Sequence, residues 1–199
     1  MGLLGGSFNP AHAGHRHVAR IARRRLRLHQ VWLLVSPGNP LKPRRGMAPL
    51  AERLASARRI ADGRRVVATD IERHLGTRYT VDTLATLRRR FPRVRFVWLM
   101  GADNLVQLPR WRRWQRIVAH ATFAVLPRPS YNHRALAGLA AHRLRRARLR
   151  TEAAPVLAAY SPPRWVFVPA PQNAASATAI RAALTGGQDH RPQAAHAAR

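Results

Sequence analysis

The chain contains no cysteine among its 199 residues. This absence excludes a disulfide scaffold, catalysis by a thiolate, and zinc or iron–sulfur sites built on cysteine. Long apolar runs are also missing, since none approaches the roughly 18 residues that a membrane-spanning helix needs. The opening residues lack the basic stretch and long apolar core of a secretory signal. We therefore expect a soluble cytoplasmic protein built around one domain.

Acidic residues are scarce, with 8 Asp and Glu against 36 Lys and Arg, a net charge of +28. Such an excess raises the possibility of a module that binds RNA or DNA, because phosphate backbones attract arginine whatever the sequence. The arginines recur, however, in separate helix-like stretches (23–25, 88–90 and 143–150) and not in one tail or patch. We therefore favour solvated helix faces that bind nucleic acid only non-specifically. A positive field would also suit a polyphosphate substrate.

Short apolar runs alternate with amphipathic segments along the chain. The expected strands are 2–4, 31–35, 66–69, 96–100, 123–126 and 165–168. The expected helices are 15–28, 50–60, 81–91, 111–118 and the very basic 134–150. Most of the strands lack apolar/polar alternation, which is typical of a parallel sheet that is buried on both faces. The pattern predicts an α/β fold, a Rossmann-like doubly wound and mainly parallel sheet flanked by helices, over residues 1–185.

Several local signals refine this prediction. Thr80 is the expected N-cap of the helix 81–91, Asp82 suits its first turn, and Pro92 should stop it. The proline- and glycine-rich segment 36–47 is expected to be a loop. The polar, alanine-rich residues 186–199 are expected to form a disordered tail. Ligands of such folds bind beyond the carboxyl ends of the strands.

The first expected strand leads directly into the chemistry-bearing residues. It ends at Gly5-Gly6, and a helix is expected to begin near His12–His15. Glycines let a backbone approach phosphate closely, and the first turn of a helix offers free N–H groups. On a helix, His12 and His15 would project from one face toward one spot, as two donors to a phosphate would. The alternatives are half of a zinc site, a plain turn, or surface histidines.

Two segments carry a family resemblance. Gly5-Gly-Ser-Phe-Asn-Pro-Ala-His-Ala-Gly-His15 resembles the signature of the nucleotidyltransferase superfamily that uses a His-x-Gly-His motif. Asn173-Ala-Ala-Ser-Ala-Thr-Ala-Ile-Arg181 resembles its second signature, Ser-x-Thr-x-Ile-Arg. The pair is far more specific than either half, because the family folds both segments onto one ATP triphosphate. Further segments resemble the nicotinate-nucleotide adenylyltransferase branch: 31–42, 78–84, 98–104, 111–114 and 128–131.

The resemblance implies transfer of AMP from ATP to nicotinate mononucleotide, giving deamido-NAD and pyrophosphate. His12, His15 and Arg181 would be catalytic, with His15 at the α-phosphoryl oxygens and Arg181 at the β- and γ-phosphates. The implied ATP-binding residues are Gly5, Gly6, Ser7, Phe8, His12, His15, Gly101, Asp103, Ser176, Thr178 and Arg181. Mg²⁺ would be held mainly by ATP and water, with no metal site formed by the protein.

The resemblance also implies the mononucleotide-binding residues, which are Asn39, Lys42, Tyr79, Thr80 and Trp111. Trp111 would stack on the pyridine ring, although core packing is the commoner fate of a tryptophan. Thr80 would present its backbone N–H to the nicotinate carboxylate, and the loop 36–47 is the candidate for closure over the substrates.

The sequence departs from the family pattern at two places. Asn9 stands where the wider superfamily often has Asp, and Ala175-Ser-Ala177 where many members read Ile-Ser-Ser. Neither change alters His12, His15 or Arg181.

Two alternative functions stay open. The acceptor of the AMP group could be nicotinamide mononucleotide or phosphopantetheine in place of nicotinate mononucleotide. The remaining alternative is a basic nucleic-acid-binding module whose nucleotide site is vestigial.

Overall fold

The computed structural model describes residues 1–38, 46–171, 177 and 181. Within these residues the strands form one seven-stranded sheet in the order β3-β2-β1-β4-β5-β7-β6. All neighbouring strands are parallel. The strands are β1 (Gly2–Gly6), β2 (Val31–Val35), β3 (Val66–Thr69), β4 (Val97–Gly101), β5 (Thr122–Leu126), β6 (Arg148–Leu149) and β7 (Trp165–Phe167). The predicted doubly wound, Rossmann-like α/β fold is confirmed.

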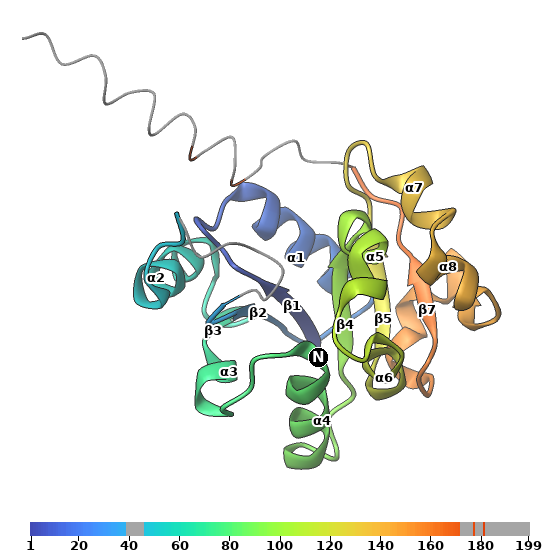
Figure 1. The fold of residues 1–199 in the computed structure, drawn as a ribbon, viewed down its shortest axis with the longest axis horizontal. Helices are drawn as coiled ribbons and strands as arrows, with labels where there is room; N and C mark the ends of the chain where they lie inside the picture. Colours follow the sequence, from blue (N-terminus) through green and yellow to red (C-terminus); the bar gives the residue numbers. More distant parts are fainter. Residues whose placement is uncertain (39–45, 172–176, 178–180, 182–199) are drawn as a thin grey trace, which may run out of the picture.

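Helices cover both faces of this sheet (Figure 1). The α-helices are α1 (Ala13–Arg25), α2 (Leu50–Ile60), α3 (Ile71–His74), α4 (Thr80–Arg90), α5 (Ala102–Gln107), α6 (Trp114–His120), α7 (Asn132–Leu136) and α8 (Leu139–Arg143). The 3₁₀ segments are η1 (Leu108–Arg110), η2 (Arg145–Ala147) and η3 (Thr151–Ala159). On one face α1, α2 and η3 pack on the sheet, and on the other α4 to α8 do.

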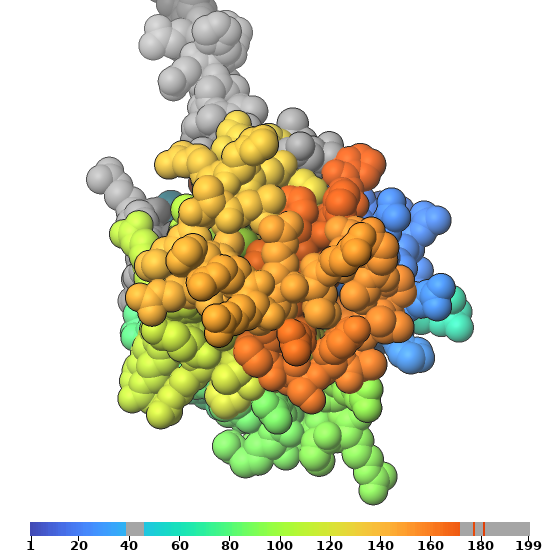
Figure 2. Space-filling model, turned by 90° about the vertical axis from the view of Figure 1, so that its right-hand side faces the viewer, coloured from blue at the N-terminus to red at the C-terminus, as the bar shows by residue number. Residues whose placement is uncertain are grey.

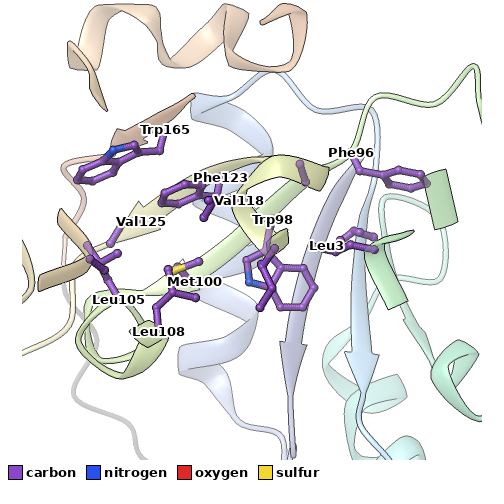
Figure 3. Close-up of a cluster of buried hydrophobic side chains, with 14 of the residues drawn as sticks. Leu3, Phe96, Trp98, Met100, Leu105, Leu108, Val118, Phe123, Val125 and Trp165 are labelled. Carbon is purple, nitrogen blue, oxygen red and sulfur yellow. The ribbon is translucent and has the colours of Figure 1, made fainter. Parts of the chain in front are cut away.

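The two faces hold separate hydrophobic cores, because strand residues alternate between them. On the face of α4 to α8, Trp98 and Leu3 lie side by side, and Phe123 stacks on Trp165 with ring centroids 5.5 Å apart (Figure 3). The opposite core includes Leu4 and Leu33. Figure 2 shows the segment that contains α7 and α8 (yellow to orange) covering the side of the molecule beyond β5.

Several predicted elements are displaced or divided in the structure. Thr80 is the first helical residue of α4, and Tyr79 is its N-cap, with extended backbone angles (φ −111°, ψ 140°) and no side-chain cap. The prediction of Thr80 as N-cap was therefore wrong by one residue, whereas Asp82 does lie in the first turn and the helix ends before Pro92.

The predicted single helix 134–150 was wrong. The chain forms α7, α8, η2 and the short edge strand β6 there. Gly138, the N-cap of α8, makes the break, since a Cβ at this position would lie 2.9 Å from the carbonyl oxygen of Arg134. A side chain could not be placed there without a shift of the backbone. The predicted tail 186–199 and part of the predicted loop 36–47 lie outside the described residues.

Candidate nucleotide-binding site

A cavity of about 790 Å³ opens at the carboxyl ends of the central strands, and this size is typical of a small-molecule site. Gly6 ends β1, Gly101 ends β4 and Leu126 ends β5, and all three line the cavity. The chain leaves β1 toward α1 on one face of the sheet and leaves β4 toward α5 on the other. The cavity therefore lies at the topological switch point, where open α/β sheets bind their ligands.

Two histidines line the cavity at the start of α1. His12 is the N-cap, and its Nδ1 accepts a hydrogen bond from Gly14 N at 3.1 Å. His15 Nδ1 in turn accepts from His12 N at 3.2 Å, which completes a capping box, and the two ring centroids lie 3.9 Å apart. The prediction that a helix starts here and brings both imidazoles to one spot is confirmed.

The capping box also determines where each imidazole carries its proton. A nitrogen that accepts a hydrogen bond has no proton of its own, so each neutral ring is protonated at Nε2 and can donate from that atom. Burial lowers the pKa of His12 below its ordinary value, and the positive charge of Arg128 lowers it further. The neutral form of His12 is thus favoured at pH 7. The first turn of α1 holds no acidic residue that would repel an anion.

The loop between β1 and α1 has an unusual backbone. Phe8 has a φ of +49°, in the left-handed region that bulky residues rarely adopt, and its side chain is buried. Its ring packs against His15 at a centroid distance of 4.8 Å. Strain of this kind gathers at functional sites, where the surrounding structure has to stabilise it. Gly5 is required by close packing, because a Cβ there would lie 2.7 Å from the ring of Trp98.

The late segment of the chain returns to this loop. Arg181 lines the cavity, and its Nη1 donates a hydrogen bond to the carbonyl oxygen of Asn9. His12, His15 and Arg181 therefore meet at one cavity although they come from distant parts of the sequence. Ser176 and Thr178, which the resemblance also implied, lie outside the described residues.

The side chain of Asn9 has a structural role. Its Nδ2 donates to Gly46 O at 2.8 Å, and its Oδ1 accepts from Ala48 N at 3.2 Å. An aspartate could not make the first of these bonds. The amide at this departure from the superfamily pattern therefore joins the first loop to residues 46–48.

Three of the residues implied for the mononucleotide also line the cavity. Tyr79, Thr80 and Trp111 all line it, together with Gly101 and Asp103 at the end of β4. The Arg112 guanidinium lies over the Tyr79 ring, 4.6 Å from its centroid, and fixes the ring by a cation–π contact. Trp111 is half-buried and also packs against the core beneath α4 to α8. Asn39 and Lys42 lie outside the described residues.

Glu72 also lines the cavity, and sequence reasoning did not single it out. Its Oε1 accepts from Thr83 Oγ1 at 3.0 Å, and Thr83 Oγ1 lies 2.9 Å from Thr77 Oγ1. Burial raises the pKa of Glu72 to about 7, although the Thr83 hydroxyl opposes this shift. In a chain with so few acids, a glutamate just before the 78–84 segment was the signal that could have indicated it.

Charge on the cavity wall is strongly positive. The arginines that line it are Arg78, Arg110, Arg112, Arg128 and Arg181. The only acids that line it, among the residues that the structure describes, are Glu72 and Asp103. Such a wall favours an anionic ligand and raises its local concentration.

No group of three or more His, Asp and Glu in the described part of the chain could hold a metal ion. Within the same residues, no helix is both long and apolar enough to span a membrane.

Comparison with known proteins identifies the family of the chain. Residues 3–183 match the model of the cytidylyltransferase-like family. The chain belongs to this family. A probable nicotinate-nucleotide adenylyltransferase from Gluconobacter oxydans (strain 621H) is 62% identical over 181 residues, 91% of this chain and 93% of that protein. One from Gluconacetobacter diazotrophicus is 59% identical over 196 residues, 98% of this chain and 91% of the relative.

A solved structure shows the same fold. The nicotinic acid mononucleotide adenylyltransferase of Plasmodium falciparum, complexed with NaAD, aligns with a TM-score of 0.66 at 17% identity. The alignment covers 91% of this chain and 82% of that one. The resemblance that the sequence motifs indicated is thus confirmed down to the nicotinate-nucleotide adenylyltransferase branch.

Proposed function

We propose that the protein transfers AMP from ATP to nicotinate mononucleotide, forming deamido-NAD and pyrophosphate in NAD biosynthesis. One observation carries the proposal: His12, His15 and Arg181 meet at a cationic cavity that Thr80 and Trp111 also line. This arrangement offers phosphate-binding groups and an aromatic acceptor site within one volume. The names of the relatives support the same reaction.

The chemistry requires positioning and charge neutralisation more than a base. An oxygen of the mononucleotide 5′-phosphate attacks the α-phosphorus of ATP, and the bond from that phosphorus to the bridging oxygen breaks. The electron pair leaves with pyrophosphate, and no proton has to be removed from the nucleophile because it is already an anion. Catalysis then depends on in-line alignment and on donors placed where charge develops.

The two histidines fit this task as hydrogen-bond donors. With Nδ1 accepting a backbone hydrogen bond in each ring, Nε2–H is the group that donates to a phosphoryl oxygen. We assign His15 to the α-phosphoryl oxygens and Arg181 to the β- and γ-phosphates, where a planar guanidinium can bind two oxygens. The remaining ATP contacts proposed are Gly5, Gly6, Ser7, Phe8, Gly101, Asp103, Ser176 and Thr178.

The acceptor is proposed to bind in the cavity beside Thr80. As the first residue of α4, Thr80 carries one of the N–H groups that have no partner within the helix, and this suits a carboxylate. Trp111 would stack on the pyridine ring, with Tyr79 beside it. Asn39 and Lys42 complete the proposed contacts.

Magnesium is proposed to arrive with ATP, held by phosphate oxygens and water. The cavity wall offers mainly histidine and arginine donors, with only two separate acids among the described residues. These side chains suit a magnesium ion that is bound to the triphosphate better than a magnesium ion that is bound permanently by the protein. When bound, Mg²⁺ would neutralise charge on the polyphosphate.

Pyrophosphate release tests the proposal. The purified protein would be incubated with ATP and Mg²⁺ and with nicotinate mononucleotide, nicotinamide mononucleotide or phosphopantetheine, with no acceptor as the control. We expect fast release with the nicotinate form, because a site that pairs a carboxylate leaves its donors poorly matched to a carboxamide. Faster release with another acceptor would correct the acceptor but keep the ATP site. No release with any acceptor would refute the proposed reaction.

A further inference from the structure

Helix α2 presents two buried polar side chains to the loop that follows β1. Arg53 is 3% exposed and Ser56 is 5% exposed, one helical turn apart on the same face of α2. Ser56 Oγ accepts a hydrogen bond from Ala11 N at 2.7 Å, directly before His12. The helix therefore contacts this loop with hydrogen-bonding groups as well as with its apolar residues.

The Arg53 guanidinium joins three segments of the chain. Its Nη1 donates to Ser7 O after β1 and to Ser36 O after β2, both at 2.7 Å. Its Nη2 donates to Pro37 O at 3.3 Å, and its Nε donates to Ala48 O at 2.9 Å. All four acceptors are backbone carbonyls. One side chain thus fixes the loops at the ends of two adjacent strands relative to α2.

No carboxylate among the described residues forms an ion pair with Arg53. Burial of a guanidinium costs free energy, which carbonyl hydrogen bonds offset only in part, and a buried charge is normally paired. A guanidinium cannot lose its proton in a protein, so this one remains a cation. The carbonyl oxygen of Ser7 accepts from Arg53, and Ser7 also lines the cavity. The positive charge of Arg53 therefore lies behind the loop that leads from β1 to His12 and His15.

We propose that Arg53 is a positioning residue for nucleotidyl transfer. It holds the loop that leads to His12 and His15 in its binding-competent form and adds a fixed positive charge behind the site of the ATP phosphates. This inference rests on the proposed function, because the triphosphate is the anion that the charge serves. Arg53 touches no substrate and acts through the backbone of Ser7 and the adjoining loop.

The test compares Arg53→Gln, which removes the charge, with Arg53→Lys, which keeps it. Arg58→Gln is the matched control, because Arg58 is exposed on the same helix and its loss changes the net charge equally. For each protein kcat, the KM for each substrate and the melting temperature would be measured. Hydrogen exchange of the backbone amides of residues 7–12 would report on the loop independently of activity.

We expect Arg53→Gln to lower kcat/KM for ATP on the order of 10- to 100-fold, the scale for small misplacement of catalytic groups. Exchange in residues 7–12 should be faster. In Arg53→Lys the KM for ATP should stay closer to the native value while kcat remains low, because one ammonium cannot reach four carbonyls. Arg58→Gln should match the native protein in every measurement.

Native kinetics in folded Arg53→Gln would overturn the inference, as would a lower melting temperature with unchanged kinetics of the folded protein. If Arg53→Gln does not fold, Arg53→Lys decides: native kcat in this variant overturns the inference. A native protein inactive with every acceptor would instead refute the proposed function. Calorimetry with a non-hydrolysable ATP analogue would then test Arg53 alone, with about tenfold weaker binding in Arg53→Gln than in Arg58→Gln supporting it and equal binding overturning it.

Discussion

Two buried ionisable side chains approach the same cavity from helices on opposite faces of the sheet, and they keep their charges to different degrees. Arg53 of α2 donates to four carbonyls and remains a cation. Glu72 of α3 accepts from Thr83 Oγ1, and burial raises its pKa to about 7. A carboxyl group can shed its charge by taking up a proton, whereas a guanidinium cannot. The difference leaves positive charge fixed on the side of the cavity where we propose that the ATP phosphates bind, and variable negative charge on the proposed acceptor side.

The largest expected effect lies on the phosphate side, at His15. Replacing it with alanine removes a donor that we place against the developing charge, so kcat should fall on the order of 10²- to 10³-fold. Steady-state pyrophosphate release checks this, with His17→Ala as the control for a nearby histidine outside the proposed machinery. Near-native kcat in His15→Ala would show that the transition state does not depend on this ring.

On the acceptor side, Glu72 should make stability depend on pH. Its pKa in the folded protein, about 7, lies above the ordinary value of 4.5, so the folded state binds the proton more tightly between these values. The free energy of unfolding should therefore fall as pH rises from 4.5 to 7, by something on the order of 3 kcal/mol at most.

Glu72→Gln isolates this contribution, since an amide oxygen can still accept from Thr83 but cannot ionise. Urea unfolding from pH 5 to 8 should show a flatter profile for the variant, which should be more stable than the native protein at pH 8. Parallel profiles for the two proteins would mean that Glu72 is ionised throughout this range and that the two sides of the cavity do not differ as described.

Trp111→Ala should produce a smaller and selective effect. Loss of one stacked aromatic surface is expected to raise the KM for nicotinate mononucleotide about tenfold, in line with the 0.5–1.5 kcal/mol or so of an aromatic pair. The KM for ATP should change little. Equal effects on both substrates would indicate that this tryptophan serves the core against which it packs and not the acceptor.

The smallest effect concerns the proton of His12. Its folded pKa lies below 6.5, because burial and Arg128 disfavour the cation. The stability that it contributes is therefore present above pH 6.5 and is lost as pH falls through the folded pKa. Nuclear magnetic resonance of the imidazole nitrogens should show a proton at Nε2 at pH 7. A proton at Nδ1 would contradict the capping box.

How much of this could be read from the sequence varied with the kind of interaction. Buried parallel strands are continuous apolar runs, so β2 and β3 were predicted with their correct bounds. The segment 134–150 is rich in helix-forming arginine, alanine and leucine, and this composition outweighed Gly138, where the helix breaks. Thr80 was predicted as the N-cap of α4 because threonine commonly caps helices, but the N-cap is the neighbouring Tyr79.

The residues at the cavity also differ in how far the sequence could predict them. Motif residues such as His12 and Arg181 were found because their spacing is a sequence pattern, and the structure brings them to one cavity. Arg53 and Glu72 have no such pattern. Arg53 is held by carbonyls from three segments, and any residue type supplies a carbonyl, so the sequence carries no trace of these partners. In a chain with so many arginines, the buried one could not be distinguished from the exposed ones.

The contact between Arg181 and Asn9 joins a residue that is synthesised early to one that is synthesised late. Asn9 accepts from Arg181, and the two residues are 172 positions apart, while β1 lies in the middle of the sheet between β2 and β4. The strand that is synthesised first thus gains its neighbours one after the other, and the phosphate loop at its end is joined by its arginine only when almost the whole domain has been translated. A partial chain that ends before Arg181 lacks the contact that this arginine makes with Asn9. On the proposed function, competence for nucleotidyl transfer is therefore reached only late in synthesis, after Arg181 has been added.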